Sequence, residues 1–268
     1  MIGGSFGMAL TQKGKYIVSF YDKNPKLTTI NIKNHLEYYE NREFISSFDL
    51  IIDATGNSHP LNFKVPTINI ASVQYQSKIP RVDVFEKLHC FIASYIDKNL
   101  VDKFIYCHPL CGSEKSGHEN ARVDLFENQN CIITTEGRTQ ELIDFATEIF
   151  NDIGMNVFHC ETAEEHNKNL AYTSHLLHYL AFNDFADLHP VLERLSHSNK
   201  EMWEGIFEAN KKNIDDALLK FTKIAVQKTG FCIFEELKKP NYFTMVYQEL
   251  VKDIPEYFYG TALKQLLK

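Results

Sequence analysis

The chain has 268 residues, of which 44% are hydrophobic and 13% aromatic, so it can bury the core of one large domain or of two medium ones. Its formal net charge of -7 gives no electrostatic reason to expect binding to nucleic acid or to an anionic membrane surface. No stretch approaches the ~20 consecutive apolar residues of a membrane span, and the first residues do not have the pattern of a signal peptide. We therefore expect a cytoplasmic protein without nucleic-acid or membrane partners.

Six cysteines are scattered along the chain without a Cys-x-x-Cys pair. A chain of this length does not need disulfides to hold its fold, so we expect reduced thiols that are mostly buried. These residues are Cys90, Cys107, Cys111, Cys131, Cys160 and Cys232.

The segment from Met1 to about residue 160 alternates short apolar runs with amphipathic stretches, which is typical of a parallel sheet flanked by helices. A helix is predicted at about 139–153, because apolar residues recur there at helical spacing and Gly154 follows where a left-handed cap would fall. The predicted strands are 16–21, 50–54, 67–71, 104–107, 131–134 and 156–160.

Strand patterns largely end at Cys160, and Thr162 and Glu165 have the spacing of a capping box that opens a helix. Apolar residues then recur at helical spacing over 163–186, 200–229 and 241–267. We therefore expect an α/β, Rossmann-type domain over residues 1–160 and an all-helical domain over residues 161–268.

Glycines at the start of the chain suggest part of a dinucleotide site. Gly3 and Gly4 are candidates for the end of a glycine loop that brings backbone N–H groups to a pyrophosphate at a helix amino end. Asp22 lies about 20 residues on, where a carboxylate binds ribose hydroxyls and favours NAD over NADP. The alternative is a helix start with small residues that only allow close packing.

The glycine motif is incomplete, because no strand and no earlier glycine precede Gly3. In a doubly wound sheet the first strand is central, and the turn after it delivers the pyrophosphate to the helix. We therefore expect this nucleotide-binding domain to be incomplete at its amino end and to bind NAD poorly or not at all.

The segment 107–117 follows a predicted strand and is expected to form a loop at the carboxyl edge of the sheet, where α/β folds bind ligands. His108 in this loop is a candidate general base, because a neutral imidazole can accept a proton from a hydroxyl. A structural histidine is the alternative. A zinc site with Cys107, Cys111 and His118 is a further alternative, which the irregular spacing disfavours.

Two histidines and an arginine in the second half are candidates for binding a carboxylate substrate. His175 and His178 are three residues apart on one predicted helix, so they share a face, although at least one is expected to be a polar group satisfied between helices. Arg194 could clamp a carboxylate through paired N–H donors, or it could lie solvated at the surface.

Together these segments resemble the prephenate dehydrogenase family. Residues 108–117, His-Pro-Leu-Cys-Gly-Ser-Glu-Lys-Ser-Gly, are similar to the family's H-P-x-x-G-[ST]-E-x-S-G run, and residues 124–128 to the D-L-F-E-N that follows it. Residues 174–182 resemble S-H-L-P-H followed by L-A-F, with Leu177 in place of proline. Residues 194–203 resemble R-[IL]-[AS]-x-S-x-x-x-x-W, and residues 70–73 resemble a D-x-G-S-V-K loop.

The resemblance implies a Rossmann-type domain, a helical domain that forms a homodimer, and oxidative decarboxylation of prephenate with NAD as hydride acceptor. His108 would accept the proton of the ring hydroxyl, and Ser72 would orient that hydroxyl and the cofactor. The substrate would be bound by Ser113, Glu114, His175 and Arg194. The cofactor would be bound by Gly3, Gly4, Ser5 and Asp22.

The sequence departs from the family pattern at Gln74, where a lysine is usual, at 54–57, and at the shortened stretch 188–191 before Arg194. Two other functions therefore stay open. One is arogenate dehydrogenase, whose substrate differs from prephenate only at the side chain. The other is a non-catalytic relative that keeps the substrate pocket and has lost NAD binding.

Overall fold

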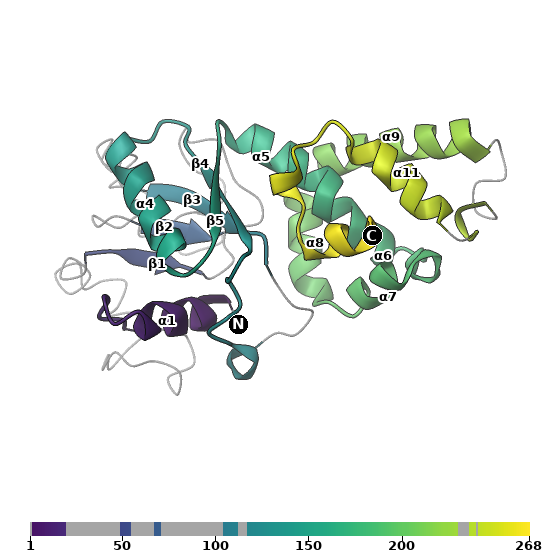
Figure 1. The fold of residues 1–268 in the computed structure, drawn as a ribbon. Helices are drawn as coiled ribbons and strands as arrows, with labels where there is room; N and C mark the ends of the chain where they lie inside the picture. Colours follow the sequence, from purple (N-terminus) through teal and green to yellow (C-terminus); the bar gives the residue numbers. More distant parts are fainter. Residues whose placement is uncertain are drawn as a thin grey trace, which may run out of the picture. The chain divides into compact units, whose positions relative to one another are not determined.

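The computed structural model describes residues 2–19, 49–54, 67–70, 104–111, 117–229, 236–239 and 241–268. The chain divides into two compact units, each described here by itself (Figure 1). The first unit comprises Met1–Pro109 and His118–Ala163, and the second comprises Leu110–Gly117 and Glu164–Lys268.

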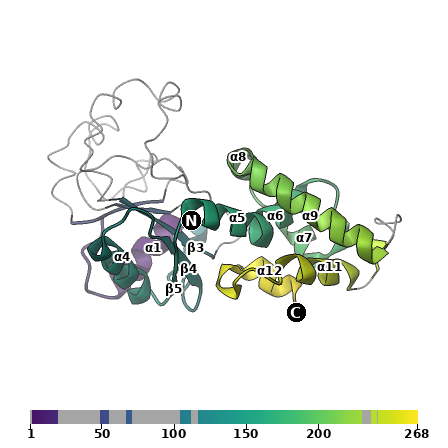
Figure 2. The same ribbon diagram turned by 90° about the horizontal axis from the view of Figure 1, so that it is seen from above.

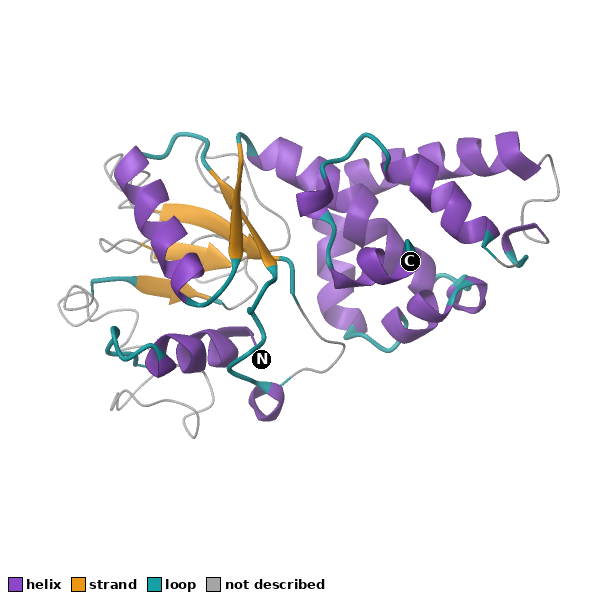
Figure 3. Ribbon diagram, viewed as in Figure 1, coloured by secondary structure: helices purple, strands orange, loops and turns teal. Residues whose placement is uncertain are grey.

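The first unit is built on a sheet whose strands run in sequence order, β1-β2-β3-β4-β5 (Figure 3). The pairs β1–β2, β2–β3 and β4–β5 are parallel, whereas β3–β4 is antiparallel. The strands are β1 Ile51–Asp53, β2 Thr67–Ile70, β3 Phe104–Pro109, β4 Asn130–Thr134 and β5 Asn156–Cys160. The α/β class is confirmed, but the expectation of a parallel sheet throughout is wrong at one pair. An antiparallel partner needs no crossover helix, and in the described part of the β3–β4 connection only the short 3-10 turn His118–Asn120 occurs.

In the part of this unit that the structure describes, α1 and α4 pack on the sheet. α4 spans Gln140–Asp152, begins where the Thr139 side chain accepts from the backbone N–H of Leu142, and is followed by Gly154 at φ 87°, as predicted. α1 spans Ile2–Gln12 and packs beside α4 through Phe6, whose ring meets that of Phe150 edge to face at 5.3 Å between centroids (Figure 2).

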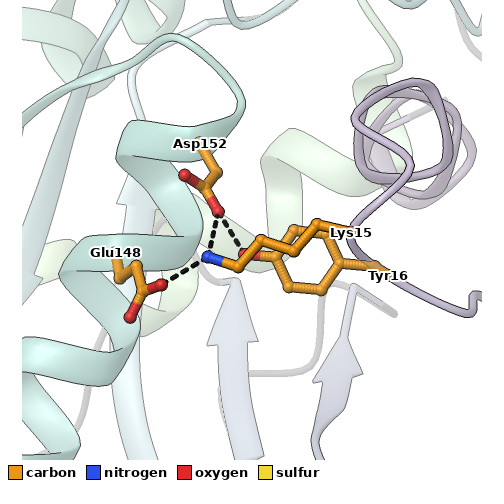
Figure 4. A network of polar contacts seen from close by, with 4 residues as sticks. All are labelled: Lys15, Tyr16, Glu148 and Asp152. Carbon is orange, nitrogen blue, oxygen red and sulfur yellow. Dashed lines mark hydrogen bonds and ion pairs between the residues drawn. The ribbon is translucent and has the colours of Figure 1, made fainter.

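The predicted strand 16–21 is wrong for its described part, because residues 16–19 form no strand. The side chains of Lys15 and Tyr16 instead bind the last turns of α4 (Figure 4). Lys15 Nζ donates to Glu148 Oε1 and, at 2.9 Å, to Asp152 Oδ2, and the Tyr16 hydroxyl donates to the same Asp152 oxygen. These contacts lie at the surface, where ion pairs contribute little to stability, and they join the segment to α4 and not to the sheet.

The second unit is all helical in its described part, as expected. The helical run from Ala163 is α5 Ala163–Leu170, a π-helical segment Ala171–His175 and α6 Leu176–Phe182. The later helices are α7 Pro190–Leu195, α8 Lys200–Ala209, α9 Lys211–Thr229, α11 Tyr242–Val251 and α12 Thr261–Leu266, with 3-10 turns at Ala186–Leu188 and Glu256–Phe258. The sequence predicted one helix over 200–229, and the structure divides it at Asn210.

The core of the second unit is built around Tyr247 on α11. Its ring lies 5.6 Å from that of Phe243 and 6.1 Å from that of Phe221 on α9, and its hydroxyl donates to the backbone carbonyl of Tyr172 at 2.8 Å. This hydrogen bond ties α11 to the π-helical segment. None of the helices in the described part of the chain is long and apolar enough to cross a bilayer.

Candidate functional site

His108 lies in strand β3 and not in a loop after it, which corrects the expectation from the sequence. β3 continues to Pro109 because it pairs with β4 up to Pro109 and Cys131, whereas its pairing with β2 ends at Ile70 and Cys107. His108 is therefore the first residue past the end of its parallel partner. The half-buried imidazole still lies at the carboxyl edge of the parallel strands, where α/β folds bind their ligands.

The sequence offers Cys107 and Cys111, near His108, as possible metal ligands. Cys107 is fully buried, and burial raises the pKa of its thiol well above the usual value, which favours the uncharged form. Within the described residues no group of three or more His, Cys, Asp or Glu side chains is placed to hold a metal ion. None of the four cysteines in the described segments forms a disulfide.

Gly3 and Gly4 lie in the first turn of α1 and allow close packing there. A Cβ atom at Gly3 would come within 3.2 Å of Ala54 Cβ, and one at Gly4 within 3.2 Å of Ala121 Cβ. This is the packing that the alternative interpretation expected. Ala54 directly follows β1, so the same contacts bring the helix amino end, with its unpaired N–H groups, beside the carboxyl end of a strand, as in nucleotide-binding folds.

Ser5 is fully buried, and its hydroxyl accepts a hydrogen bond from the backbone N–H of Arg122 at 3.0 Å. The side chain thus connects α1 to the segment before β4 inside the first unit. The predictions for Asp22, Ser72, Ser113 and Glu114 lie outside the residues that the structure describes, and they stay predictions.

The second unit brings together both histidines of the predicted helix face. His175 ends the π-helical segment and His178 lies in the first turn of α6, and both are buried. The ring of His178 stacks on Trp203 of α8, with centroids 3.5 Å apart, while the ring of His175 meets Trp203 edge to face at 6.0 Å. The expectation that the two histidines share a face is confirmed.

His178 is held as a neutral ring. Its Nδ1 lies 3.1 Å from the carbonyl oxygen of Ser174, which can only accept, so Nδ1 carries the proton. Burial lowers its pKa to about 3; the hydrogen bond to Ser174 opposes this shift, and the charge of Arg194 contributes to it. Arg194 therefore acts on this histidine electrostatically. Its guanidinium, half-buried on α7, donates to Gln265 Oε1 of α12 at 3.0 Å.

His175 differs from His178 because one of its ring nitrogens is left over. Its Nδ1 lies 2.9 Å from the amide nitrogen of Asn210, but its buried Nε2 has no hydrogen-bond partner among the described residues. Burial first, and then His166 and His178, lower its pKa to about 3. An unpaired buried polar group costs about 1–3 kcal/mol, and such groups are retained mainly where a ligand or a strained site uses them.

Sequence reasoning gave no role to Trp203 or Asn210. The signal for Trp203 was its place at the end of the motif 194–203. The residue is 8% exposed, and its ring contacts both His175 and His178, which together we call the histidine cluster. Asn210 could have been found as a polar residue within a predicted helix of regular apolar spacing. The structure makes it a buried residue between α8 and α9 with 4% exposure.

Comparison with known proteins identifies the family. Residues 6–159 match the model of the family described as "Prephenate dehydrogenase, nucleotide-binding domain". This match covers more than half of the chain and contains the described sheet, α4 and His108. A curated relative, the prephenate dehydrogenase of Lactococcus lactis, is 32% identical over 165 residues, which are 51% of this chain and 44% of that protein. The matched part thus spans less than half the length of that relative.

Solved structures show the same fold. A prephenate dehydrogenase from A. aeolicus, in complex with hydroxyphenyl propionate and NAD+, superposes with a TM-score of 0.62 at 20% identity, covering 91% of this chain and 94% of that one. The arogenate dehydrogenase of Synechocystis superposes with a TM-score of 0.59 at 16% identity, covering 96% of each chain. At these identities the likeness concerns the fold.

Proposed function

We propose, on the premise that this chain belongs to the prephenate dehydrogenase family, that it catalyses the NAD-dependent oxidative decarboxylation of prephenate to 4-hydroxyphenylpyruvate. The observation that carries the proposal is the family match over residues 6–159 together with His108 at the carboxyl edge of the strands inside it. Membership supports an oxidoreductase, and the choice of prephenate and of NAD is our proposal.

The first turn of α1 fits a dinucleotide. Gly3 lets the helix amino end approach the end of β1, and the first turn carries no acidic side chain that would repel a pyrophosphate. Bound there, NAD supplies the hydride acceptor. Gly3 and Gly4 contribute backbone N–H groups, and Ser5 supports this turn from inside through Arg122. Asp22 binds the ribose and excludes a 2′-phosphate.

His108 acts as the general base of the reaction. The neutral imidazole accepts the proton of the ring hydroxyl as hydride leaves the carbon that bears this hydroxyl. Loss of carbon dioxide then makes the ring aromatic. Ser72 orients the hydroxyl. A side chain fixed on a strand supports this role, because the pairing of His108 with Ile132 of β4 limits the movement of the His108 backbone.

The substrate is a dianion in an acidic protein, so a local cation is required to bind it. Arg194 supplies that charge, and its proximity to His178 supports a place beside the histidine cluster. His175 provides a further polar contact, and Ser113 and Glu114 line the same pocket. We also propose that the helical unit forms a homodimer.

Turnover assays test the proposal directly. The purified protein is given prephenate or arogenate with NAD or NADP, and formation of the reduced cofactor and of the aromatic product is followed. The proposal expects prephenate with NAD to give the highest kcat/KM. Preference for arogenate would favour the activity named for the Synechocystis neighbour. Binding of prephenate without turnover would support the non-catalytic alternative.

A further inference from the structure

Asn210 has a buried side-chain amide, and only one orientation of this amide forms hydrogen bonds with the groups around it. Its Nδ2 lies 2.8 Å from the backbone carbonyl of Asn167, and its Oδ1 accepts from Nδ2 of Asn213 at 2.8 Å. A carbonyl oxygen cannot donate, so the atom facing Asn167 must be the amide nitrogen. The orientation of the Asn210 side chain follows from these two contacts without reference to His175.

The second hydrogen of the Asn210 amide then faces the ring of His175. The distance from Asn210 Nδ2 to His175 Nδ1 is 2.9 Å, and an amide nitrogen has no lone pair to offer. His175 Nδ1 must therefore accept, which leaves the ring proton of the neutral imidazole on Nε2. His178 has the opposite arrangement, with its proton on Nδ1 against Ser174.

The Nε2–H group of His175 is a donor that the second unit does not use. The side chain is 0% exposed, and Nε2 has no partner among the described residues. The ring also stays uncharged, because burial lowers its pKa to about 3. A neutral, buried and fixed donor is suited to an oxygen acceptor, and it is unsuited to an ammonium group, which can only donate.

We propose that Asn210 is a positioning residue that holds His175 as an Nε2–H donor, and that this donor selects the keto oxygen of prephenate against the ammonium group of arogenate. The inference rests on the proposed function, since these two substrates differ at that position of the side chain. Discrimination of this kind is strong when a buried group of the site would be left unpaired or opposed by the wrong substrate.

The tautomer can be measured without any turnover. In the full chain with 15N-labelled histidine, NMR shifts of the two ring nitrogens report which one carries the proton, and a His175→Gln variant assigns the signals. The expected result at neutral pH is a protonated Nε2 and an unprotonated Nδ1, with a shift of the Nε2–H signal when prephenate is added. A proton on Nδ1 of His175 would overturn the inference.

Substitution of Asn210 tests its positioning role. In Asn210→Asp the carboxylate can only accept, so the ring proton should move to Nδ1. The control is Asn213→Ala, which removes a neighbour of Asn210 and leaves both of its amide hydrogens in place. The control should keep the proton on Nε2. If Nδ1 of His175 stays unprotonated in Asn210→Asp, Asn210 does not fix the tautomer.

Specificity is read as the ratio of kcat/KM for prephenate to that for arogenate. The ratio should exceed one in the unmodified protein and fall by about tenfold or more in Asn210→Asp, in line with the loss of one hydrogen bond in a buried site. An unchanged ratio in Asn210→Asp would overturn the selection role. A preference for arogenate in the unmodified protein would overturn it too, and this can be measured even if Asn210→Asp fails to fold. Absence of turnover with both substrates, with the expected tautomer observed, would refute the proposed function and leave the tautomer assignment standing.

Discussion

The imidazole of His178 stacks on the indole of Trp203 with their planes inclined by 16° and their centroids 3.5 Å apart. Trp203 is the only tryptophan of the chain, so tryptophan fluorescence reports on the surroundings of this one ring, in which His178 makes the stacked contact. A protonated imidazole quenches a stacked indole, and burial lowers the pKa of His178 to about 3. We therefore expect the emission to stay constant between about pH 8 and pH 5, although a free histidine, with a pKa of ~6.5, would become protonated within this range.

The control for this titration is His178→Leu, which should have the same flat profile because it lacks the titrating ring. A quenching step with a midpoint near the pKa of a free histidine, present in the unmodified protein and absent in His178→Leu, would contradict a buried neutral His178.

The proposed base is tested by His108→Asn. The amide keeps a hydrogen-bonding side chain on β3 but cannot accept a proton, so kcat with prephenate should fall by about two orders of magnitude or more while the melting temperature changes little. A matched control is His159→Asn, which makes the same change at an exposed position of β5. If the His108 variant turned over prephenate as fast as the control, His108 would not be the general base.

Arg194 is expected to act in substrate binding more than in the chemical step. Arg194→Ala should raise the KM for prephenate by about tenfold or more with a smaller change in kcat, because a carboxylate clamp acts in the ground state and the transition state alike. Gln265→Ala is the control, since it removes the described partner of the guanidinium and keeps the positive charge. An unaltered KM for prephenate in Arg194→Ala would show that Arg194 does not bind the substrate.

The elements that the sequence predicted well are those in which local and tertiary preferences agree. The helix α4 has a cap at Thr139, an apolar face and a left-handed Gly154, and each of these signals depends on residues close in sequence. The segment 16–19 also has a strand-like composition, but it forms no strand, and Lys15 and Tyr16 bind α4, more than 130 residues away. Strand propensity depends on the local residue types, so it cannot predict a contact between residues so far apart in the sequence.

The candidate site was predictable in its residue types and less so in its geometry. Spacing placed His175 and His178 on one face, but the π-helical turn that precedes α6 depends on packing and leaves no periodic signal. Motif order likewise indicated His108, whereas the extension of β3 through that residue follows from pairing with β4, a strand that begins more than 20 residues later. Tautomers depend on partners such as Asn210, which are distant in sequence.

Substitution of Ser5 tests whether its side chain stabilises the first unit or binds the cofactor. Ser5→Ala leaves the backbone N–H of Arg122 without its acceptor, so the free energy of unfolding should fall by about 1–2 kcal/mol. NAD affinity should change little under conditions where the variant is folded. Thr11→Ala is a suitable comparison, because that hydroxyl only donates back to the Gly7 carbonyl of its own helix. Loss of NAD affinity without loss of stability would instead indicate a direct contact of the Ser5 side chain with the cofactor.

Acid should destabilise the second unit through its buried histidines. The pKa values of His166, His175 and His178 are lowered to about 4, 3 and 3, in each case mainly by burial. In the unfolded chain these groups titrate near ~6.5, so below that pH the unfolded state binds more protons than the folded state. Their contribution to stability is therefore fully present above about pH 6.5 and is lost as the pH falls toward the folded values. Each group adds a slope of up to about 1.4 kcal/mol per pH unit.

Urea unfolding at a series of pH values checks this effect. His166→Leu removes one of the three groups from a position beside Phe258 and should reduce the contribution of the buried histidines to the pH dependence between about pH 6 and pH 4 by about one third. The control is His197→Leu, at an exposed position after α7, which should keep the full slope. Comparing slopes cancels the carboxylates that also titrate in this range, because both variants retain them. Equal slopes in the two variants would mean that His166 is protonated in the folded protein, and that water reaches a ring which the structure places wholly in the interior.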